Sequence, residues 1–445
     1  MRCDALALSL AATALTVGCS TRFPPPTVPD LTARTGVATR PADAHGTVLP
    51  PGVRLDDGLA QDEAVAIALW NNPDFQAGIA QLGFARADLL EAGLLRNPVL
   101  SLLFPIGPKQ LEATLRFPIE VLWERPKRIA AARVAADAAA AGLEQSGLIL
   151  VFNVKTAYID LVVAQDRLQL AEQAASELAQ IDQLTQSRLR AGDISELEAR
   201  TATIEAARAR QEAIRAAGDV SLRANALRRW LGLALDEITF SIASADAAIR
   251  VCAPDAALLE DALASRPDVR AAELAVEAAG RRLGGEESRV LALSAVLDAN
   301  GNGDEGFELG PGVEVGLPIF DRNQAGRARA EAELQRAGRA YIAARQNVAT
   351  EIREATTLLA QARTSVTGWR DTVLAPLEQQ VRAADRAFTD GEASYLFVLE
   401  MNRRLTEARL RARESEADAA RALARIERAV GRRCGTTERE ITRGF

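Results

Sequence analysis

The sequence contains few of the residues on which most catalytic and metal sites depend. Its 445 residues include one histidine, His45, four cysteines and two methionines. His45 has no second histidine or suitably spaced cysteine near it, so a zinc site or a nucleophile–histidine pair cannot form around it. The glycines at 284–285 and 301–312 lack the phosphate-loop pattern. The sequence therefore predicts a protein that is not an enzyme and that has neither a metal site nor a cofactor.

Aromatic residues and long apolar runs are also scarce. Aromatics make up 4% of the chain, and alanine, leucine, arginine and glutamate take their place. This composition is typical of long helices that pack closely through small side chains. No run of 18 or more apolar residues follows the N-terminus, so no membrane-spanning helix is expected, although strands of a closed barrel could cross a bilayer. The net charge of −7 comes from interspersed charges of both signs, which favours solvated helix faces over a nucleic-acid surface.

The N-terminus has the pattern of an export signal. Residues 1–19 contain Arg2, an apolar stretch and Cys19. The segment that ends in Cys19 resembles the lipobox of bacterial lipoproteins, in which the cysteine is acylated. Thr16, Val17 and Asp4 depart from the usual pattern, so an ordinary signal peptide is the alternative. Residues 20–54 are rich in proline and are predicted to form an extended tether.

The chain contains an internal duplication, with four pairs of matching segments in the same order. Pro73 and Pro267 lie 194 residues apart, Pro118 and Pro318 lie 200 apart, and Gly192 and Gly391 lie 199 apart. Trp230-Leu231-Gly232 matches Ala429-Val430-Gly431, again with a separation of 199. A repeat of this size governs the whole fold. It predicts one repeat over 55–250, a second over 251–432 and a C-terminal tail over 433–445.

Each repeat is predicted to contain two entry helices, two strands, a long helix, a glycine break and a return helix. The strands are expected at about 99–105, 110–117, 289–298 and 308–317, and the long helices at about 125–190 and 323–388, with Pro376 bending the second. Apolar and polar residues alternate along the strands, as rows facing lipid and a lumen require. The expected apolar rows are Leu111, Ala113, Leu115 and Phe117; Leu291, Leu293, Ala295 and Leu297; and Val313, Val315 and Leu317.

Together these features resemble the TolC-like outer-membrane efflux proteins over residues 55–432. The segment from Pro318 to Gln324 is similar to the subgroup that works with heavy-metal exporters of the resistance-nodulation-division type. The resemblance implies a mainly α fold with a small β part. Duplicated long antiparallel helical hairpins would form a trimeric α-barrel, and four strands per chain would contribute to a shared twelve-stranded transmembrane β-barrel. A four-stranded sheet packed on helices in a soluble protein is the alternative.

The resemblance also implies a function and partners. The homotrimer would be the exit duct of a tripartite efflux system, lipid-anchored in the outer membrane with a helical tunnel in the periplasm. It would passively conduct substrate, heavy-metal cations among the candidates, from an inner-membrane pump and a periplasmic adaptor to the outside. Its other contact would be outer-membrane lipid, with no nucleic acid. The alternatives are a type I secretion or drug-efflux channel and a periplasmic coiled-coil scaffold without a pore.

Site residues follow from the same resemblance. The adaptor-docking tips would be Gly192, Asp193, Ser195, Gly391, Glu392 and Ser394. The pore constriction would involve Phe397 and Glu400, with Glu198 at the matching place in the first repeat. Phe397 departs from the acidic residue usual there, and three Glu400 carboxylates around one axis would attract cations and raise one another's pKa. Ordinary coiled-coil flank positions are the alternative. Cys252 and Cys434 would form a disulfide in an oxidising periplasm or remain free thiols.

Overall fold

The computed structural model describes residues 46–55, 57–106, 111–235, 240–242, 255–301, 306–390, 392 and 395–432. The predicted signal with Cys19, most of the tether, the tip residues Gly391 and Ser394, and both Cys252 and Cys434 lie outside these residues. The described residues pack as two units. The first contains 79–142 and 270–343, and the second contains 46–78, 143–269 and 344–432.

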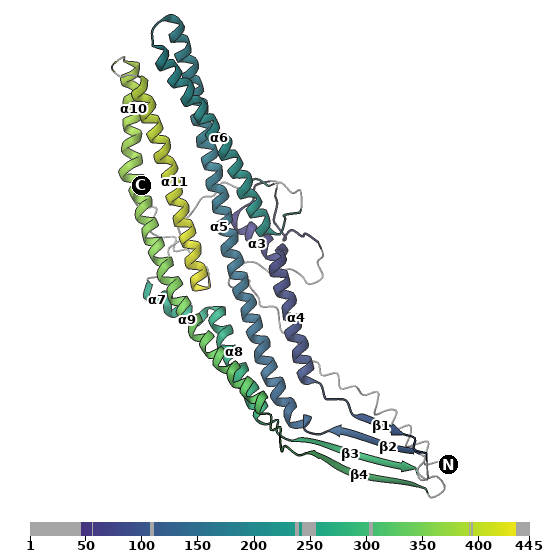
Figure 1. Cartoon of the computed structure of the whole chain (residues 1–445). Coiled ribbons are helices and arrows are strands. Elements are labelled where there is room, and N and C mark those ends of the chain that lie inside the picture. The colour runs from purple at the N-terminus through teal and green to yellow at the C-terminus, as the bar shows by residue number, and fades with distance from the viewer. Residues whose placement is uncertain are drawn as a thin grey trace. The chain divides into compact units, whose positions relative to one another are not determined.

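The elements follow the same order in the two halves of the chain. The first half has α3 (Gln61–Asn71), α4 (Pro73–Gly93), β1 (Val99–Leu103), β2 (Leu111–Pro118), α5 (Val121–Ala191) and α6 (Glu196–Leu231). The second has α7 (Asp255–Ser265), α8 (Pro267–Glu287), β3 (Ala292–Gly301), β4 (Phe307–Gly316), α9 (Gln324–Thr367), the π-helical segment η2 (Gly368–Leu374), α10 (Ala375–Thr389) and α11 (Tyr395–Val430). Figure 1 shows α5 with α6, and α10 with α11, as two long hairpins.

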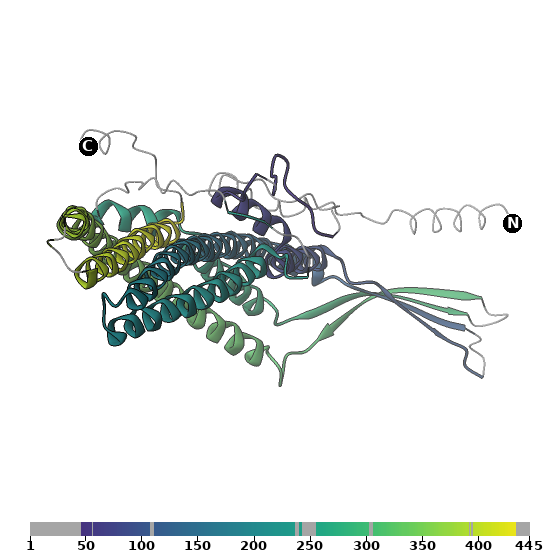
Figure 2. The same cartoon turned by 90° about the horizontal axis from the view of Figure 1, so that it is seen from above.

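The four strands form one antiparallel sheet in the order β1-β2-β3-β4, seen side by side in Figures 1 and 2. β3 begins three residues later than predicted, because the N–H groups of Ser288 and Arg289 bond to the carbonyls of Gly285 and Glu286 and extend the last turn of α8. Leu291 therefore lies just before β3, and Leu317 lies just after β4, which ends at Gly316. The Ile119 N–H donates to Leu293 O (2.9 Å), so the sheet hydrogen bonding continues past Pro118 towards α5.

The register gives the sheet one apolar and one largely polar face. Leu115 pairs with Leu297, Ala295 with Val313, and Leu293 with Val315, which confirms that the predicted apolar rows share a face. On the other face Thr114 donates to Asp298 (2.8 Å), and Arg116 forms an ion pair with Glu314 (2.8 Å). β1 departs from the alternation: Val99 and Leu103 pair with Arg116 and Glu112 on the polar face.

The long helix of the first half, α5, runs for 71 residues without interruption. It begins four residues earlier than predicted, so Pro126 lies inside its second turn. One 18-residue window of α5 is apolar enough, by length and composition alone, to cross a membrane, a test that a buried core helix also passes. More than half of that window, 56%, is buried within the chain, as it is in a core helix.

The corresponding helix of the second half is interrupted near the proline predicted to bend it. α9 ends at Thr367, and the seven residues of η2 form a π-helix before α10 begins at Ala375. The N–H of Ala375 donates to Arg370 O, five residues back. Pro376 has no N–H, and its ring would clash with the Thr372 carbonyl in a regular α-helix. The wider π turn relieves that clash.

Candidate functional site

The first predicted tip is the reversal between α5 and α6. Gly192 follows the last residue of α5 with a φ of 81°. Its N–H donates to Leu189 O and that of Asp193 to Arg188 O, each at 3.0 Å, so terminal carbonyls of the helix are satisfied. A residue with a Cβ would be strained at this φ, although the surrounding space is open. Gly192 therefore ends the helix, and Asp193 is left exposed at the reversal.

Ser195 and Glu198 form a capping box at the start of α6. The Glu198 N–H donates to Ser195 Oγ (3.3 Å), and the Ser195 N–H donates to Glu198 Oε2 (2.9 Å). The bonds from the Ser195 backbone and hydroxyl lower the pKa of Glu198. Ser195, predicted to contact an adaptor, thus starts the return helix, and Glu198, predicted to line a constriction, completes the cap.

At the second tip the structure describes Glu392 but neither Gly391 nor Ser394. The N–H of Asp390 donates to Arg386 O (2.9 Å) and that of Glu392 to Ala387 O (2.7 Å), which closes the end of α10. The Glu392 side chain is exposed. Phe397, near the start of α11, is 50% exposed.

Glu400 lies on α11 between two arginines of its own helix. Its carboxylate accepts from Arg403 Nε (2.9 Å) and Nη2 (3.1 Å) and from Arg404 Nε (2.7 Å). Hydrogen bonds from Arg403 and then from Arg404 lower the pKa of Glu400 to about 2. Within one chain the pKa of Glu400 thus moves in the opposite direction from the mutual rise expected for three unpaired carboxylates.

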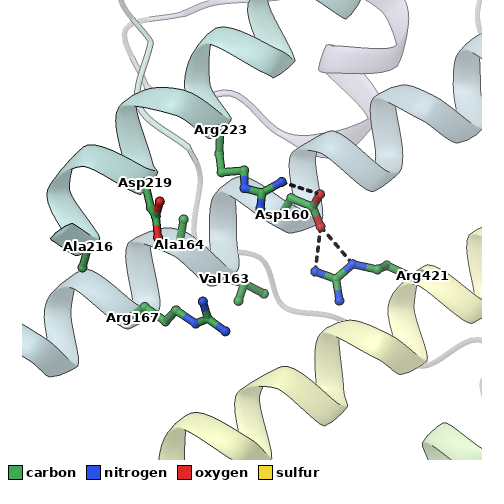
Figure 3. Close-up of a pocket in the computed structure, with 8 residues that line it drawn as sticks. All are labelled: Asp160, Val163, Ala164, Arg167, Ala216, Asp219, Arg223 and Arg421. Carbon is green, nitrogen blue, oxygen red and sulfur yellow. Dashed lines mark hydrogen bonds and ion pairs between the residues drawn. The ribbon is translucent and has the colours of Figure 1, made fainter. Parts of the chain in front are cut away.

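A charged pocket of about 110 Å³ lies where α5, α6 and α11 meet. In Figure 3, Asp160 of α5 points between Arg421 of α11 and Arg223 of α6. Its Oδ1 accepts from Arg421 Nε (2.9 Å) and Nη2 (2.6 Å), and Arg223 Nη1 lies 3.5 Å from Oδ2. Arg167, also in the lining, forms an ion pair with Glu414 of α11. The three arginines are all paired with acids, so the pocket joins three helices and is not an open anion site.

Buried charges connect further elements. Arg266 is 2% exposed, and it binds both carboxylate oxygens of Asp268 (2.9 and 2.6 Å), Glu351 (2.5 Å) and the Ala429 carbonyl (3.1 Å). Lys155 of α5 forms a buried pair with Glu427 of α11 at 2.5 Å. Sequence reasoning missed the Arg266–Glu351 and Lys155–Glu427 pairs, because their members are 85 and 272 residues apart and each resembles an ordinary helix-surface charge. The only signal was the match of Arg266-Pro267 to Asn72-Pro73.

Asn72 in the first half makes a hydrogen bond that corresponds to one made by Arg266 in the second half. Its Nδ2 donates to Trp230 O (3.0 Å), two residues before Gly232, just as Arg266 bonds to Ala429 O, two residues before Gly431. Both glycines end their helices with a positive φ, 76° and 78°. A Cβ on Gly232 would lie 2.2 Å from Asn71 O. The repeated sequence signals thus mark one structural joint that occurs twice.

Within the described residues, no group of three or more histidine, cysteine, aspartate or glutamate side chains is placed to hold a metal ion.

Comparison with known proteins shows similarity to efflux proteins along most of the chain. The family described as "Outer membrane efflux protein" matches residues 64–233 and 258–432. The chain is 28% identical over 404 residues to the cobalt-zinc-cadmium resistance protein CzcC of Cupriavidus metallidurans, covering 89% of this chain and 96% of that protein. It is 26% identical over 275 residues to the cation efflux system protein CusC of Escherichia coli, with 59% of each covered.

Solved structures show the same fold. A structure of CusC superposes with a TM-score of 0.70 at 20% identity, covering 88% of this chain and 98% of that one. The outer membrane protein VceC of Vibrio cholerae gives a TM-score of 0.68 at 19% identity, with 84% and 96% covered. Since the family match includes both halves of the chain with their hairpins and strands, this protein belongs to the outer membrane efflux protein family.

Proposed function

We propose that three copies of this chain form the exit duct of a tripartite efflux system, which passively conducts heavy-metal cations received from an inner-membrane pump and a periplasmic adaptor. The observation that carries the proposal is the sheet. One of its faces is apolar and the other largely polar. The second strand of each half, β2 or β4, is followed along the chain by the long helix of that half, α5 or α9.

The edges of the sheet argue for several chains in one barrel. β1 and β4 each have a neighbour on one side only within the described chain. In lipid, unpaired backbone N–H and C=O groups are strongly unfavourable, so strands cross a membrane only as a closed barrel. Four strands are too few to enclose a conducting lumen. Pairing of β1 with β4 of the next copy satisfies both edges, and three copies supply twelve strands.

Exposed apolar side chains at both ends of the sheet support insertion in a bilayer. β2 and β4 both run opposite to β3, so their C-terminal ends lie at the same end of the sheet. Trp123 and Phe320, which follow these two strands, are exposed. Phe104 and Phe307, at the opposite end of the strands, are also exposed. The ten residues of β4 extend about 33 Å, which at a tilt of about 45° spans about 23 Å. This height is near that of the apolar band of outer-membrane barrels, and the aromatics correspond to its flanking girdles.

The assignment of cargo and partners rests on the relatives. CzcC is named for resistance to cobalt, zinc and cadmium, and CusC for cation efflux. Similarity over 96% of CzcC supports a metal-cation cargo for this chain as well. For adaptor docking we propose Gly192, Asp193 and Ser195 at the exposed first reversal, together with Gly391, Glu392 and Ser394 of the second predicted tip. Phe397, Glu400 and Glu198 remain proposed constriction residues.

Single-channel conductance of the purified protein in planar bilayers tests the duct. We expect discrete openings, and we expect Glu400→Ala to change their size or ion selectivity. Glu407→Ala, an exposed acid further along α11, is the matched control and should have no effect. A folded protein that remains monomeric and water-soluble without detergent contradicts the duct. Openings that Glu400→Ala leaves unchanged contradict the constriction alone.

Cargo is tested separately in cells that lack the gene. Loss of the protein should lower tolerance to cobalt, zinc or cadmium salts, and the full chain should restore it. Unchanged metal tolerance together with lost drug tolerance or protein export would contradict the metal assignment and leave the duct in place.

A further inference from the structure

The four connections between helices and strands lie at one end of the sheet. β1 and β3 begin where β2 and β4 end, because neighbouring strands are antiparallel. The helices α4, α5, α8 and α9 meet the sheet there (Figure 1). We call residues 94–98, 119–128, 288–291 and 317–323, all of which belong to the first unit, the junction band.

Each segment of the junction band exposes a large apolar side chain. Leu95, Trp123, Leu291 and Phe320, one from each segment, are 39% to 90% exposed. Contact between apolar side chains and water is unfavourable, and exposed groups of them mark surfaces that an apolar partner covers. In the proposed duct that cover is the boundary of the hydrocarbon layer.

Each of these apolar side chains has an exposed basic side chain within four residues of it along the chain. The four pairs are Leu95 with Arg96, Trp123 with Lys127, Leu291 with Arg289, and Phe320 with Arg322. The long stems of lysine and arginine lie along apolar surface while their charged ends reach polar surroundings. This arrangement, repeated four times, fits the boundary between hydrocarbon and polar headgroups.

Three of these cations have few partners in their own chain. Arg322 forms no ion pair within the described residues, and its Nε donates to Pro318 O at 3.2 Å. Lys127 Nζ has one long hydrogen bond, of 3.4 Å, to a carbonyl of α8. Arg289 Nη1 lies 3.8 Å from a carboxylate oxygen of Glu286. All three side chains therefore keep N–H groups available for an external acceptor.

The acids of the junction band offset only part of its positive charge. The band contains six basic and three acidic residues. Glu120 and Glu124 are 7% exposed, and the carboxylate of Asp321 accepts a backbone N–H at 2.8 Å. At the opposite end of the sheet, the described ends of the strands contain Glu112 and Glu308 and no basic residue. Positive charge is thus concentrated at the end of the sheet that meets the helices.

We propose that the junction band binds the phosphate groups of anionic phospholipids in the leaflet that faces the helices. A guanidinium donates two parallel hydrogen bonds to phosphate oxygens, and a lysine ammonium binds phosphate as a point charge. Each basic residue near an anionic membrane surface adds about a fivefold gain in association. The inference rests on the proposed function, which places the sheet in a bilayer.

Quenching of tryptophan fluorescence by brominated lipids tests this preference with the full chain in vesicles. Trp123 lies in the junction band, whereas Trp70, Trp230 and Trp369 belong to the second unit. We expect brominated phosphatidylglycerol to associate next to Trp123 about fivefold more strongly than brominated phosphatidylcholine. The preference should fall as NaCl rises from about 50 to about 500 mM, because salt screens the attraction between exposed charges.

The combined variant Lys127→Gln, Arg289→Gln and Arg322→Gln should reduce the preference to less than about twofold. Arg96 stays in place, because it pairs with the buried Glu120 at 3.6 Å. If the combined variant does not fold, Arg322→Gln alone, which breaks no ion pair of the described residues, should lower the preference. The matched control replaces three exposed arginines of α6 with glutamine and should leave the preference unchanged: Arg200, Arg208 and Arg215.

The outcomes separate this inference from the duct. Equal association of the two lipids, or a preference that survives the combined substitution, would overturn the inference and leave the duct in place. Inorganic phosphate should displace no more brominated lipid than NaCl of the same ionic strength, and a larger displacement would assign the band to free phosphate instead. If neither lipid quenches Trp123 although the protein forms channels, the band faces a second copy or the lumen and the inference fails. A protein that does not insert into vesicles contradicts the duct as well.

Discussion

At the scale of single residues, the side chains predicted to act at the tips also hold the local backbone. Ser195 and Glu198 cap α6, and Gly192 ends α5 with a positive φ. Glu400 is bound by Arg403 and Arg404. A substitution at one of these positions therefore changes local structure as well as any contact with a partner, and experiments must separate the two effects.

Replacement of Ser195 by alanine should destabilise the start of α6 by about 1 kcal/mol, because the N-cap acceptor for the Glu198 N–H is lost. Faster amide exchange over the first turn of α6 measures this loss. Thr201→Ala, at an exposed position inside the same helix, is the control. Equal effects of the two substitutions would mean that the cap contributes nothing.

Glu400 gives a prediction about pH. Its pKa falls from 4.5 to about 2 in the folded chain, so its ionised form stabilises the fold above about pH 4.5. That contribution is lost as the pH falls towards 2, because the carboxylate then binds a proton in the folded state too. The difference in melting temperature between the natural protein and Glu400→Gln should therefore shrink between pH 4.5 and 2. A difference that grows as the pH falls would refute the assignment.

At the scale of elements, the two halves share a joint but use different side chains to make it. Asn72 and Arg266 both precede the proline that begins a helix, and both reach the carbonyl two residues before a terminal glycine. The asparagine is neutral and makes few bonds. The arginine is buried and bonds to Asp268 and Glu351, and those hydrogen bonds raise its pKa against the effect of desolvation by burial, the largest single contribution. The second joint therefore depends on a charge that must stay paired.

Arg266→Ala should destabilise the protein by about 3–5 kcal/mol, because Glu351 and the Ala429 carbonyl lose a buried donor. Asn72→Ala, the matched change in the first half, should cost about 1–3 kcal/mol. Thermal unfolding monitored by circular dichroism measures both. Arg266→Lys should recover only part of the stability. If Arg266→Ala and Asn72→Ala lower the free energy of unfolding by similar amounts, the buried charge does not stabilise the second joint more than the neutral asparagine stabilises the first.

At the scale of the whole molecule, membership of the outer membrane efflux family makes the protein an outer-membrane transport channel and not an enzyme. Its fold is mainly helical, with one four-stranded antiparallel sheet. One face of the sheet is apolar and the other is largely polar. The two faces of the sheet should accordingly respond differently to charge.

Val313→Lys introduces a charge on the apolar face, where the side chain of Val313 is 66% exposed in the single chain. If that face contacts lipid, the substitution should destabilise the inserted protein by up to about 2–4 kcal/mol and reduce its yield in the outer membrane. Ser294→Lys, on the polar face opposite Glu314, should be tolerated. The assay is the amount of folded, heat-modifiable protein in outer-membrane fractions. Equal tolerance at both positions would mean that the apolar face is not exposed to lipid.

The sequence by itself determined the features that have a local period. Long stretches rich in helix-forming residues predicted the long helices, alternation of apolar and polar residues predicted the faces of β2, β3 and β4, and the spacing of Pro118 and Pro318 revealed that one plan of elements occurs twice. The pairing of Glu400 with Arg403 and Arg404 can also be predicted from the sequence, because residues three and four apart on a helix are neighbours.

Only the tertiary structure decided which charges are structural. Lys155 meets Glu427, and Asp160 meets Arg421, across 272 and 261 residues of chain. In the sequence each of these residues looks like one more solvated helix charge, because burial depends on which helix faces meet. The sequence shows only that a proline lies within the predicted long helix near η2. It does not predict the π turn itself, because a kink and a widened turn both accommodate the missing N–H. Local periodicity fixes the elements, but contacts between distant elements decide which side chains hold them together.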